Sequence, residues 1–155
     1  MNSRYKVLLL GNSKIGKSLF LNSIVKSEYD SPTIGLNLAI YQVDDIEIVF
    51  WDVSGDDRYK EIRKSYYYDT DIVVICFHDY LEIEKWIEES CLSCKLFMLC
   101  DMQDPKKFLS TLLKKIKSIK PIYTLHDFIL LCEPNGCVLP NNRRLLSDIV
   151  FPQEN

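Results

Sequence analysis

The residues best suited to chemistry lie close together at positions 11–18, which read GNSKIGKS. This spacing fits the pattern G-x-x-x-x-G-K-[S/T], in which two glycines let the backbone turn tightly and aim its N–H groups at phosphate oxygens. Lys17 would bring a positive charge to the β and γ phosphates, and the Ser18 hydroxyl is placed to bind Mg²⁺. We therefore predict a phosphate-binding loop whose nucleotide contacts come from Gly11, Ser13, Lys14, Ile15, Gly16, Lys17 and Ser18.

The segments on either side of this loop can hold it in place. Residues 5–10 form a continuous apolar run typical of a buried strand, and residues 17–27 are predicted to form a helix. The N-terminus of that helix adds partial positive charge beside a bound phosphate. The loop by itself does not separate GTP-binding proteins from nucleotide kinases or ATPases.

Two further segments narrow the class. Positions 51–59 read WDVSGDDRY at the end of an apolar strand, and positions 31–35 read SPTIG. The first resembles the W-D-T-A-G-Q-E-R-Y of the Rab family of small GTPases, and the second resembles that family's P-T-I-G. The resemblance implies that Asp52 holds Mg²⁺ through water, that the Gly55 amide contacts the γ-phosphate, and that Thr33 closes over the metal and this phosphate.

The same resemblance identifies two segments that would contact the guanine base. Tyr29 stands where the family keeps an aromatic residue against the base. Cys132 and Glu133 begin the segment that corresponds to the family's S-A-K loop, and both are poor matches to it.

The main guanine-recognition motif of the family, N-K-x-D, corresponds to positions 101–104, which read DMQD. Asp104 keeps the carboxylate that accepts two hydrogen bonds from guanine, whereas Asp101 and Met102 replace the Asn and the Lys. These replacements predict weaker and less selective guanine binding than the family norm. The alternative is that Asp104 only caps the helix that begins at Pro105.

The position of the family's catalytic Gln is occupied by Asp56. A carboxylate can accept a hydrogen bond from the attacking water, but it cannot donate one to the γ-phosphate, and it adds negative charge where charge must be neutralised. Because intrinsic hydrolysis in this class is only ~10⁻⁴ s⁻¹, we expect it to be slow or absent here. Lys14 either screens Asp56 or points into solvent. The predicted catalytic residues are Asp56, Lys17 and Thr33, and the predicted metal ligands are Ser18, Thr33 and Asp52.

The elements that position these residues alternate between strands and helices. Further strands are predicted at residues 36–43, 46–51, 71–77, 96–100 and 128–132, and further helices at 60–68, 81–90, 105–119 and 142–151. We predict one domain over residues 1–155 with the α/β fold of P-loop NTPases. Its doubly wound, mostly parallel six-stranded sheet has one antiparallel edge hairpin and helices on both faces. Ligands of such sheets bind beyond the carboxyl ends of the strands, where the motifs fall.

Three other side-chain groups have simple structural interpretations. Trp86 is predicted to pack toward the sheet, and His78 to end a strand. Four glutamates on the predicted helix 81–90 are expected to face water: Glu82, Glu84, Glu88 and Glu89.

Composition restricts the setting in which the chain works. The net charge of −3 argues against a nucleic-acid partner, and no apolar run reaches the ~18 residues that span a bilayer. Asn2 excludes myristoylation, and the last residues offer no prenylation cysteine, so no lipid anchor is expected. Six cysteines without a secretory signal favour reduced thiols in the cytoplasm. Zinc is the alternative use of four of them, Cys91, Cys94, Cys132 and Cys137.

These observations predict a switch that binds GTP or GDP with Mg²⁺ and hydrolyses GTP slowly. Protein effectors or regulators would contact residues 33–38 and 56–68. The first alternative is a pseudo-GTPase, an interaction module that sequesters Rab partners or effectors. The second is a small-molecule kinase, which would need an acceptor-side base and a basic lid that the sequence does not show.

Overall fold

The computed structural model describes residues 3–25, 33–90 and 94–119. Strands and helices alternate through these residues, as predicted. The strands are β1 (Ser3–Leu10), β2 (Leu36–Val43), β3 (Ile46–Val53), β4 (Thr70–Cys76) and β5 (Cys94–Cys100). The helices are α1 (Lys17–Val25), the 3₁₀ turn η1 (Asp57–Tyr59), α2 (Lys60–Tyr66), α3 (Leu81–Ser90) and α4 (Pro105–Ser118).

The described strands form one sheet in the order β2-β3-β1-β4-β5. β1 lies between β3 and β4 and is parallel to both, and β5 extends the parallel part of the sheet beside β4. β2 pairs with β3 in antiparallel register from Leu36↔Val53 to Val43↔Ile46, so this hairpin forms one edge. The predicted α/β fold, with its mostly parallel sheet and antiparallel edge hairpin, is confirmed. The predicted sixth strand at 128–132 and last helix at 142–151 lie outside the described residues.

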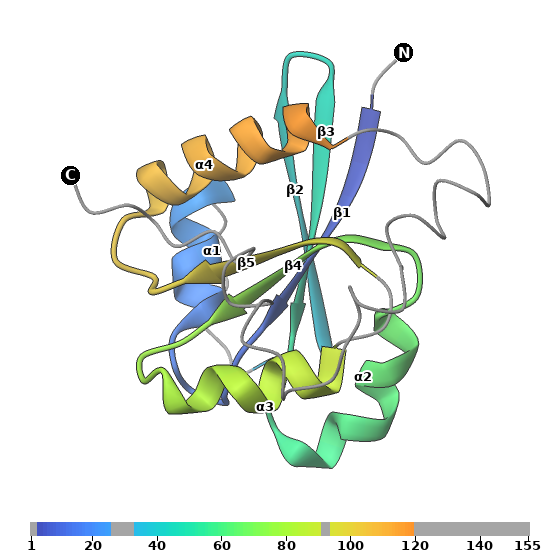
Figure 1. Cartoon of the computed structure of the whole chain (residues 1–155), viewed down its shortest axis with the longest axis vertical. Helices are drawn as coiled ribbons and strands as arrows, with labels where there is room; N and C mark the ends of the chain where they lie inside the picture. The colour runs from blue at the N-terminus through green and yellow to red at the C-terminus, as the bar shows by residue number, and fades with distance from the viewer. Residues whose placement is uncertain (1–2, 26–32, 91–93, 120–155) are drawn as a thin grey trace.

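Helices cover both faces of the sheet (Figure 1). On one face, α1 and α4 pack through Phe20, Leu112 and Ile116 against inward-facing residues of the strands. On the other face, α2 and α3 contribute a second cluster that includes Tyr67, just after α2, and Trp86. The predicted packing of Trp86 toward the sheet is therefore confirmed.

Two helix starts have capping residues that the sequence supplies. Asp104 precedes α4, and its side chain accepts hydrogen bonds from the main-chain N–H groups of Lys106 and Lys107. Pro105 occupies the first turn, where its missing N–H is not needed. Asp56 caps η1 through the N–H of Arg58, so the helical region starts earlier than the predicted residue 60 and α2 ends at Tyr66.

The parallel strands run in one direction, so their carboxyl ends lie together at the same end of the sheet. The loop after β1, the segment after β3 and the loop after β5 all leave from this end. The fold thus gathers motifs that are far apart in the sequence. No helix in the described ranges has the length and apolar composition needed to cross a membrane.

Candidate functional site

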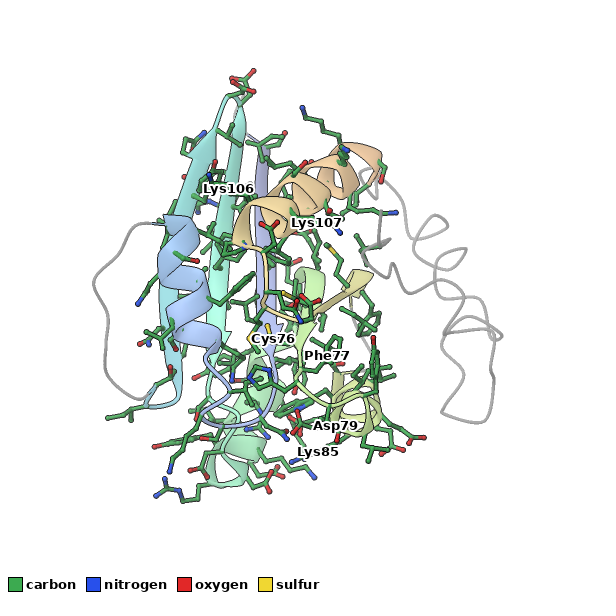
Figure 2. All side chains as sticks on the ribbon, turned by 90° about the vertical axis from the view of Figure 1, so that its left-hand side faces the viewer. Cys76, Phe77, Asp79, Lys85, Lys106 and Lys107 are labelled. Atoms are coloured by element: carbon green, nitrogen blue, oxygen red, sulfur yellow. The ribbon has the colours of Figure 1, made fainter. Side chains whose placement is uncertain are left out.

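The loop between β1 and α1 adopts a wrapped backbone that its glycines permit. Gly11 and Gly16 have φ angles of +149° and +94°, which side chains disfavour. A Cβ atom on Gly11 would lie 2.4 Å from the carbonyl oxygen of Cys76 at the end of β4, so the loop sits directly on the sheet. Cys76 itself is an interior residue (Figure 2).

Lys17 turns its ammonium group back into this loop. Its Nζ donates hydrogen bonds of 3.0 Å to the carbonyl oxygens of both Gly11 and Asn12. The residue is only 6% exposed, and this burial lowers the pKa of Lys17, although the nearby Asp52 carboxylate opposes the shift. The positive charge is therefore held at the centre of the loop.

Three oxygen-bearing side chains from separate elements meet beside Lys17. The Ser18 hydroxyl, at the start of α1, is hydrogen-bonded to the Asp52 carboxylate near the end of β3. Thr33 Oγ1 lies 2.9 Å from Ser18 Oγ and 3.3 Å from Asp52 Oδ2. Asn37, the cross-strand neighbour of Asp52, donates to Thr33 Oγ1 over 3.3 Å. The structure thus brings together all three residues predicted as metal ligands.

This cluster fits a magnesium ion chemically. Asp52 is 1% exposed, and this burial raises its pKa. The hydrogen bonds from Ser18 and Thr33 and the charge of Lys17 lower the pKa but do not offset the burial. Its second oxygen, Oδ1, is buried and has no hydrogen-bond partner among the described residues. A buried carboxylate oxygen without a partner is costly, and hydroxyl and carboxylate oxygens are ligands that Mg²⁺ prefers. A magnesium ion would use the unpartnered oxygen.

The backbone of Gly55 lies in close contact with the phosphate-binding loop. A Cβ atom at this position would lie 2.1 Å from the Gly11 carbonyl oxygen and 2.6 Å from the Ser13 nitrogen. Only glycine fits between the two segments. The end of β3 and the loop after β1 therefore form one continuous wall.

An open pocket of about 430 Å³ lies against this wall. Its lining combines the loop, the start of α1, the segment before β2 and the segment after β3. The lining residues are Ser13, Lys14, Gly16, Lys17, Ser18, Leu19, Thr33, Ile34, Ser54, Gly55, Asp56, Arg58 and Tyr59. Most of the predicted phosphate and metal contacts thus share one cavity.

Asp56 is paired with an arginine in the same segment. The Arg58 guanidinium donates to both carboxylate oxygens of Asp56 at 2.7–3.1 Å, and the Arg58 main-chain N–H donates to Oδ1 at 2.9 Å. These hydrogen bonds lower the pKa of Asp56 to about 2. Lys14 was considered either to screen Asp56 or to point into solvent. The structure supports the solvent-facing role, because Lys14 is exposed and Arg58 pairs with Asp56 instead.

The three described residues predicted to contact guanine lie after β5, outside the lining of this pocket. Asp101 Oδ1 accepts from the Gln103 N–H at 3.2 Å, and Met102, with φ of +60°, packs partly against the core. Asp104 Oδ1 accepts from the Lys106 and Lys107 N–H groups, both at 3.0 Å, which is the capping role considered as the alternative. The other predicted base contacts, Tyr29, Cys132 and Glu133, lie outside the described residues.

Comparison with known proteins is decisive for the family. A family model described as Ras of Complex, Roc, domain of DAPkinase matches residues 6–100, more than half of the chain. The chain belongs to the Ras superfamily of GTP-binding domains. This confirms that the motifs of the phosphate-binding loop and of positions 51–59 are those of a Ras-superfamily domain.

Individual relatives of this GTPase-like chain come from more than one branch of the superfamily. GTP-binding protein rho3 of Schizosaccharomyces pombe is 32% identical, with 63% of this chain and 57% of the relative covered. Rho-related GTP-binding protein RhoE of Homo sapiens is 30% identical, with coverage of 73% and 52%. Ras-related protein rab-39 of Caenorhabditis elegans is 24% identical, with coverage of 58% and 45%. The chain therefore spans about half the length of these relatives.

The GTPase fold also contains a buried arginine that sequence reasoning missed. Arg63 of α2 is fully buried, and its guanidinium donates to the main-chain carbonyls of Ser54 at 2.8 Å and Asp56 at 2.7 Å. It also pairs with Glu89 of α3 at 2.7 Å and lies over the Trp86 ring. The expectation that Glu89 faces water is wrong, because this ion pair draws its carboxylate inward.

Two more contacts tie neighbouring elements to the phosphate-binding loop of this GTPase-like chain. Trp86 Nε1 donates a 2.9 Å hydrogen bond to Asn12 Oδ1. His78 follows β4, as predicted, and its Nε2 lies 2.9 Å from the Ile15 carbonyl oxygen. The sequence indicated the Trp86 contact only through the predicted inward position of that side chain. It indicated the His78 contact only through the predicted position of His78 at the end of a strand.

The cysteines described by the structure are consistent with plain thiols. Cys76 and Cys100 are buried and free, and they face each other across β4 and β5. Within the described ranges no group of three or more His, Cys, Asp or Glu residues could hold a metal. Three of the four cysteines of the zinc alternative, Cys91, Cys132 and Cys137, lie outside those ranges.

Proposed function

We propose that this chain is a nucleotide-dependent switch that binds GTP or GDP together with Mg²⁺. The observation that carries the proposal is the convergence of Lys17, Ser18 and Thr33 on one pocket. Behind them lies Asp52, which is hydrogen-bonded to Ser18 and Thr33 and whose Oδ1 is buried and unpartnered among the described residues. The family membership supports the same ligand, since the relatives rho3 and RhoE are named GTP-binding proteins.

Each residue of the pocket has a separate task in this proposal. Bound Mg²⁺ would neutralise part of the phosphate charge, held by Ser18, Thr33 and Asp52. Lys17 would exchange its carbonyl partners in the loop for phosphate oxygens, which are stronger acceptors because they carry charge. Main-chain N–H groups of the loop and of Gly55 would donate to the remaining oxygens.

The proposed switching surface consists of residues 33–38 and 56–68. Thr33 lies in the first segment and would respond to the terminal phosphate directly. Both segments present large apolar side chains to solvent: Ile34 is 80% exposed, Leu38 57% and Tyr68 82%. We propose that these side chains contact protein partners. We also propose that the chain is Rab-like, because of the sequence at positions 51–59, and that it works in the cytoplasm.

Hydrolysis is proposed to be slow. Asp56 replaces the residue that orients the attacking water, and its carboxylate is already engaged by Arg58. An ionised Asp56 cannot donate a hydrogen bond to the γ-phosphate. We therefore expect turnover at or below the ~10⁻⁴ s⁻¹ of unassisted small GTPases.

A pseudo-GTPase is the second candidate, and one observation favours it. Asp104 Oδ1 is already used by two main-chain N–H groups of α4, and Asp101 and Met102 replace the usual Asn and Lys. A domain of this kind would keep its partner-binding surface without a nucleotide cycle.

Titration of nucleotide-stripped protein with fluorescent GTP and GDP tests the proposal. We expect micromolar or tighter binding in Mg²⁺, a marked loss in EDTA, and competition by GTP rather than ATP. Lys17→Ala should abolish binding, because it removes the buried charge of the loop. Lys117→Ala is the matched control, since Lys117 is an exposed lysine of α4 that does not line the pocket. Equal binding by wild type and Lys17→Ala, or none by folded wild type, would reject the switch.

Two further assays separate the switch from the pseudo-GTPase. Single-turnover hydrolysis that falls in Asp52→Ala favours the switch. Absence of nucleotide binding, combined with capture of a small GTPase or its effector by the same folded protein, favours the interaction module.

A further inference from the structure

Arg58 lines the proposed phosphate pocket, and its guanidinium forms an ion pair with Asp56. Both residues line the cavity that also contains Lys17 and Thr33. The Arg58 Nε lies 3.1 and 3.0 Å from the two Asp56 oxygens, and Nη2 lies 2.7 Å from Oδ2. The carboxylate thus receives the planar fork of the guanidinium, the same geometry in which arginine binds a phosphate group.

We propose that Asp56 and Arg58 form a latch that the terminal phosphate of GTP opens, and that Arg58 determines the preference for a triphosphate over a diphosphate. This inference rests on the proposed function. In the GDP form Asp56 holds Arg58. In the GTP form the γ-phosphate takes the guanidinium, and the Asp56 carboxylate turns toward solvent.

The two partners differ in their freedom to move. The main chain of Asp56 is anchored, because its carbonyl accepts a 2.7 Å hydrogen bond from the buried Arg63. The Arg58 side chain is 80% exposed and rests loosely over the Tyr59 ring at 5.9 Å. An exposed ion pair contributes little to stability, so a competing anion can open it. Arg58 is the mobile partner of the latch.

The two other acidic side chains of the segment 56–68 are already paired with lysines, and one of these pairs is Glu61 with Lys64. Asp57 is engaged by Lys85 of α3, with Nζ 2.9 Å from Oδ1 (Lys85 is labelled in Figure 2). Asp52 is buried with Ser18 and Thr33. With these described carboxylates engaged, an anion that enters the pocket can compete with Asp56 for the guanidinium, and a γ-phosphate carries more charge than a carboxylate.

The latch also accounts for how an acidic residue is tolerated at position 56. A bare carboxylate at the pocket rim would repel the γ-phosphate across a few ångströms. Paired with Arg58, the segment is locally neutral. After the exchange, the guanidinium neutralises part of the γ-phosphate charge, while the Asp56 carboxylate faces solvent, where water screens it.

The test compares affinities for a non-hydrolysable GTP analogue and for GDP, both in Mg²⁺, by fluorescence titration. Arg58→Ala should weaken binding of the analogue about tenfold and leave GDP binding within twofold of wild type. Asp56→Asn should strengthen binding of the analogue severalfold, again without a change for GDP. Arg58→Lys should restore part of the lost preference, because it keeps the charge but not the fork.

Arg4→Ala is the matched control, since Arg4 forms an exposed ion pair with Glu47 away from the pocket. Circular dichroism would establish that each variant is folded. An analogue-to-GDP affinity ratio that stays constant in Arg58→Ala, while wild type binds both nucleotides, overturns the latch and leaves the proposed function standing. A wild type that binds neither nucleotide rejects the proposed function, and the latch with it.

Discussion

Arg63 and Glu89 form an ion pair that is almost entirely withdrawn from solvent. The Arg63 side chain is 0% exposed and that of Glu89 6%, with Nε and Oε1 2.7 Å apart. Burial alone would raise the pKa of Glu89, but hydrogen bonds from Arg63 and Tyr67 outweigh burial and hold the pKa below its usual value. Because Arg63 also holds the carbonyls of Ser54 and Asp56, the pair ties the segment after β3 to α3.

Removing the charge of Glu89 should destabilise the domain strongly. Glu89→Gln leaves the buried Arg63 uncompensated, so we expect a loss of about 3–5 kcal/mol in the free energy of unfolding at pH 7. A lowered folded-state pKa means that this stability is present at neutral pH and is lost as the pH falls below about 4. Urea unfolding between pH 3 and 8 should therefore show a shallower acid decline in Glu89→Gln. Glu61→Gln, on an exposed pair, should change little.

The hydrogen bond from Trp86 to Asn12 should contribute to both stability and nucleotide retention. Trp86→Phe keeps an aromatic ring in the core but removes the donor, and we expect a loss of about 1–2 kcal/mol in unfolding free energy. GDP should also dissociate faster. Asn12→Ala should have a similar effect, and the double variant should lose clearly less than the sum of the two. Strict additivity would contradict an energetic role for this bond.

Glycine is required at position 55 for steric reasons and at position 35 for conformational ones. A Cβ at Gly55 would meet the Gly11 oxygen at 2.1 Å, whereas a Cβ at Gly35 would meet nothing within 4 Å. Gly35→Ala should cost only about 1 kcal/mol, through strain at its φ of +77°. Gly55→Ala must separate β3 from the phosphate-binding loop and should weaken nucleotide binding more than tenfold. Equal nucleotide affinities for the two variants would contradict this close contact.

Asp104 can be tested for a role beyond its helix cap. Asp104→Asn keeps an acceptor for the Lys106 and Lys107 N–H groups, so α4 should remain stable, whereas Asp104→Ala should lose about 1 kcal/mol. If the carboxylate recognises guanine, Asp104→Asn should still weaken GTP binding about tenfold, since Asn supplies only one acceptor oxygen. Unchanged GTP affinity in a stable Asp104→Asn variant would assign Asp104 to the cap alone.

Predictions from the sequence succeeded where a single element carries the signal. The run IVVIC of β4 is apolar and rich in β-branched residues, which favours a buried strand, and Trp86 lies on the apolar side of a helical repeat. The spacing of Gly11, Gly16 and Lys17 is local, so the loop could be predicted with its geometry. Ser18 belongs to the same motif, whereas the role of Asp52 was implied by the resemblance of positions 51–59 to the Rab sequence.

The contacts that sequence reasoning missed depend on how separate elements pack. Arg63 lies among the polar residues of KEIRKSY, where it has the pattern of a surface residue. It is buried because α3 brings Glu89 and the Trp86 ring against it. The pairing of Asp56 with Arg58 depends on the start of the 3₁₀ turn η1, where Asp56 is the N-cap and its carboxylate accepts from the Arg58 main-chain N–H. Neither periodicity nor a motif reveals such partners.

Calorimetric titration of GTP into nucleotide-stripped protein, in Mg²⁺ and again in EDTA, tests the central claim most directly. The arrangement of Lys17, Ser18, Thr33 and Asp52 predicts one site per chain with a dissociation constant in the micromolar range or below, weakened at least tenfold when the metal is removed. A folded sample that releases no heat with either GTP or GDP in Mg²⁺ would contradict it.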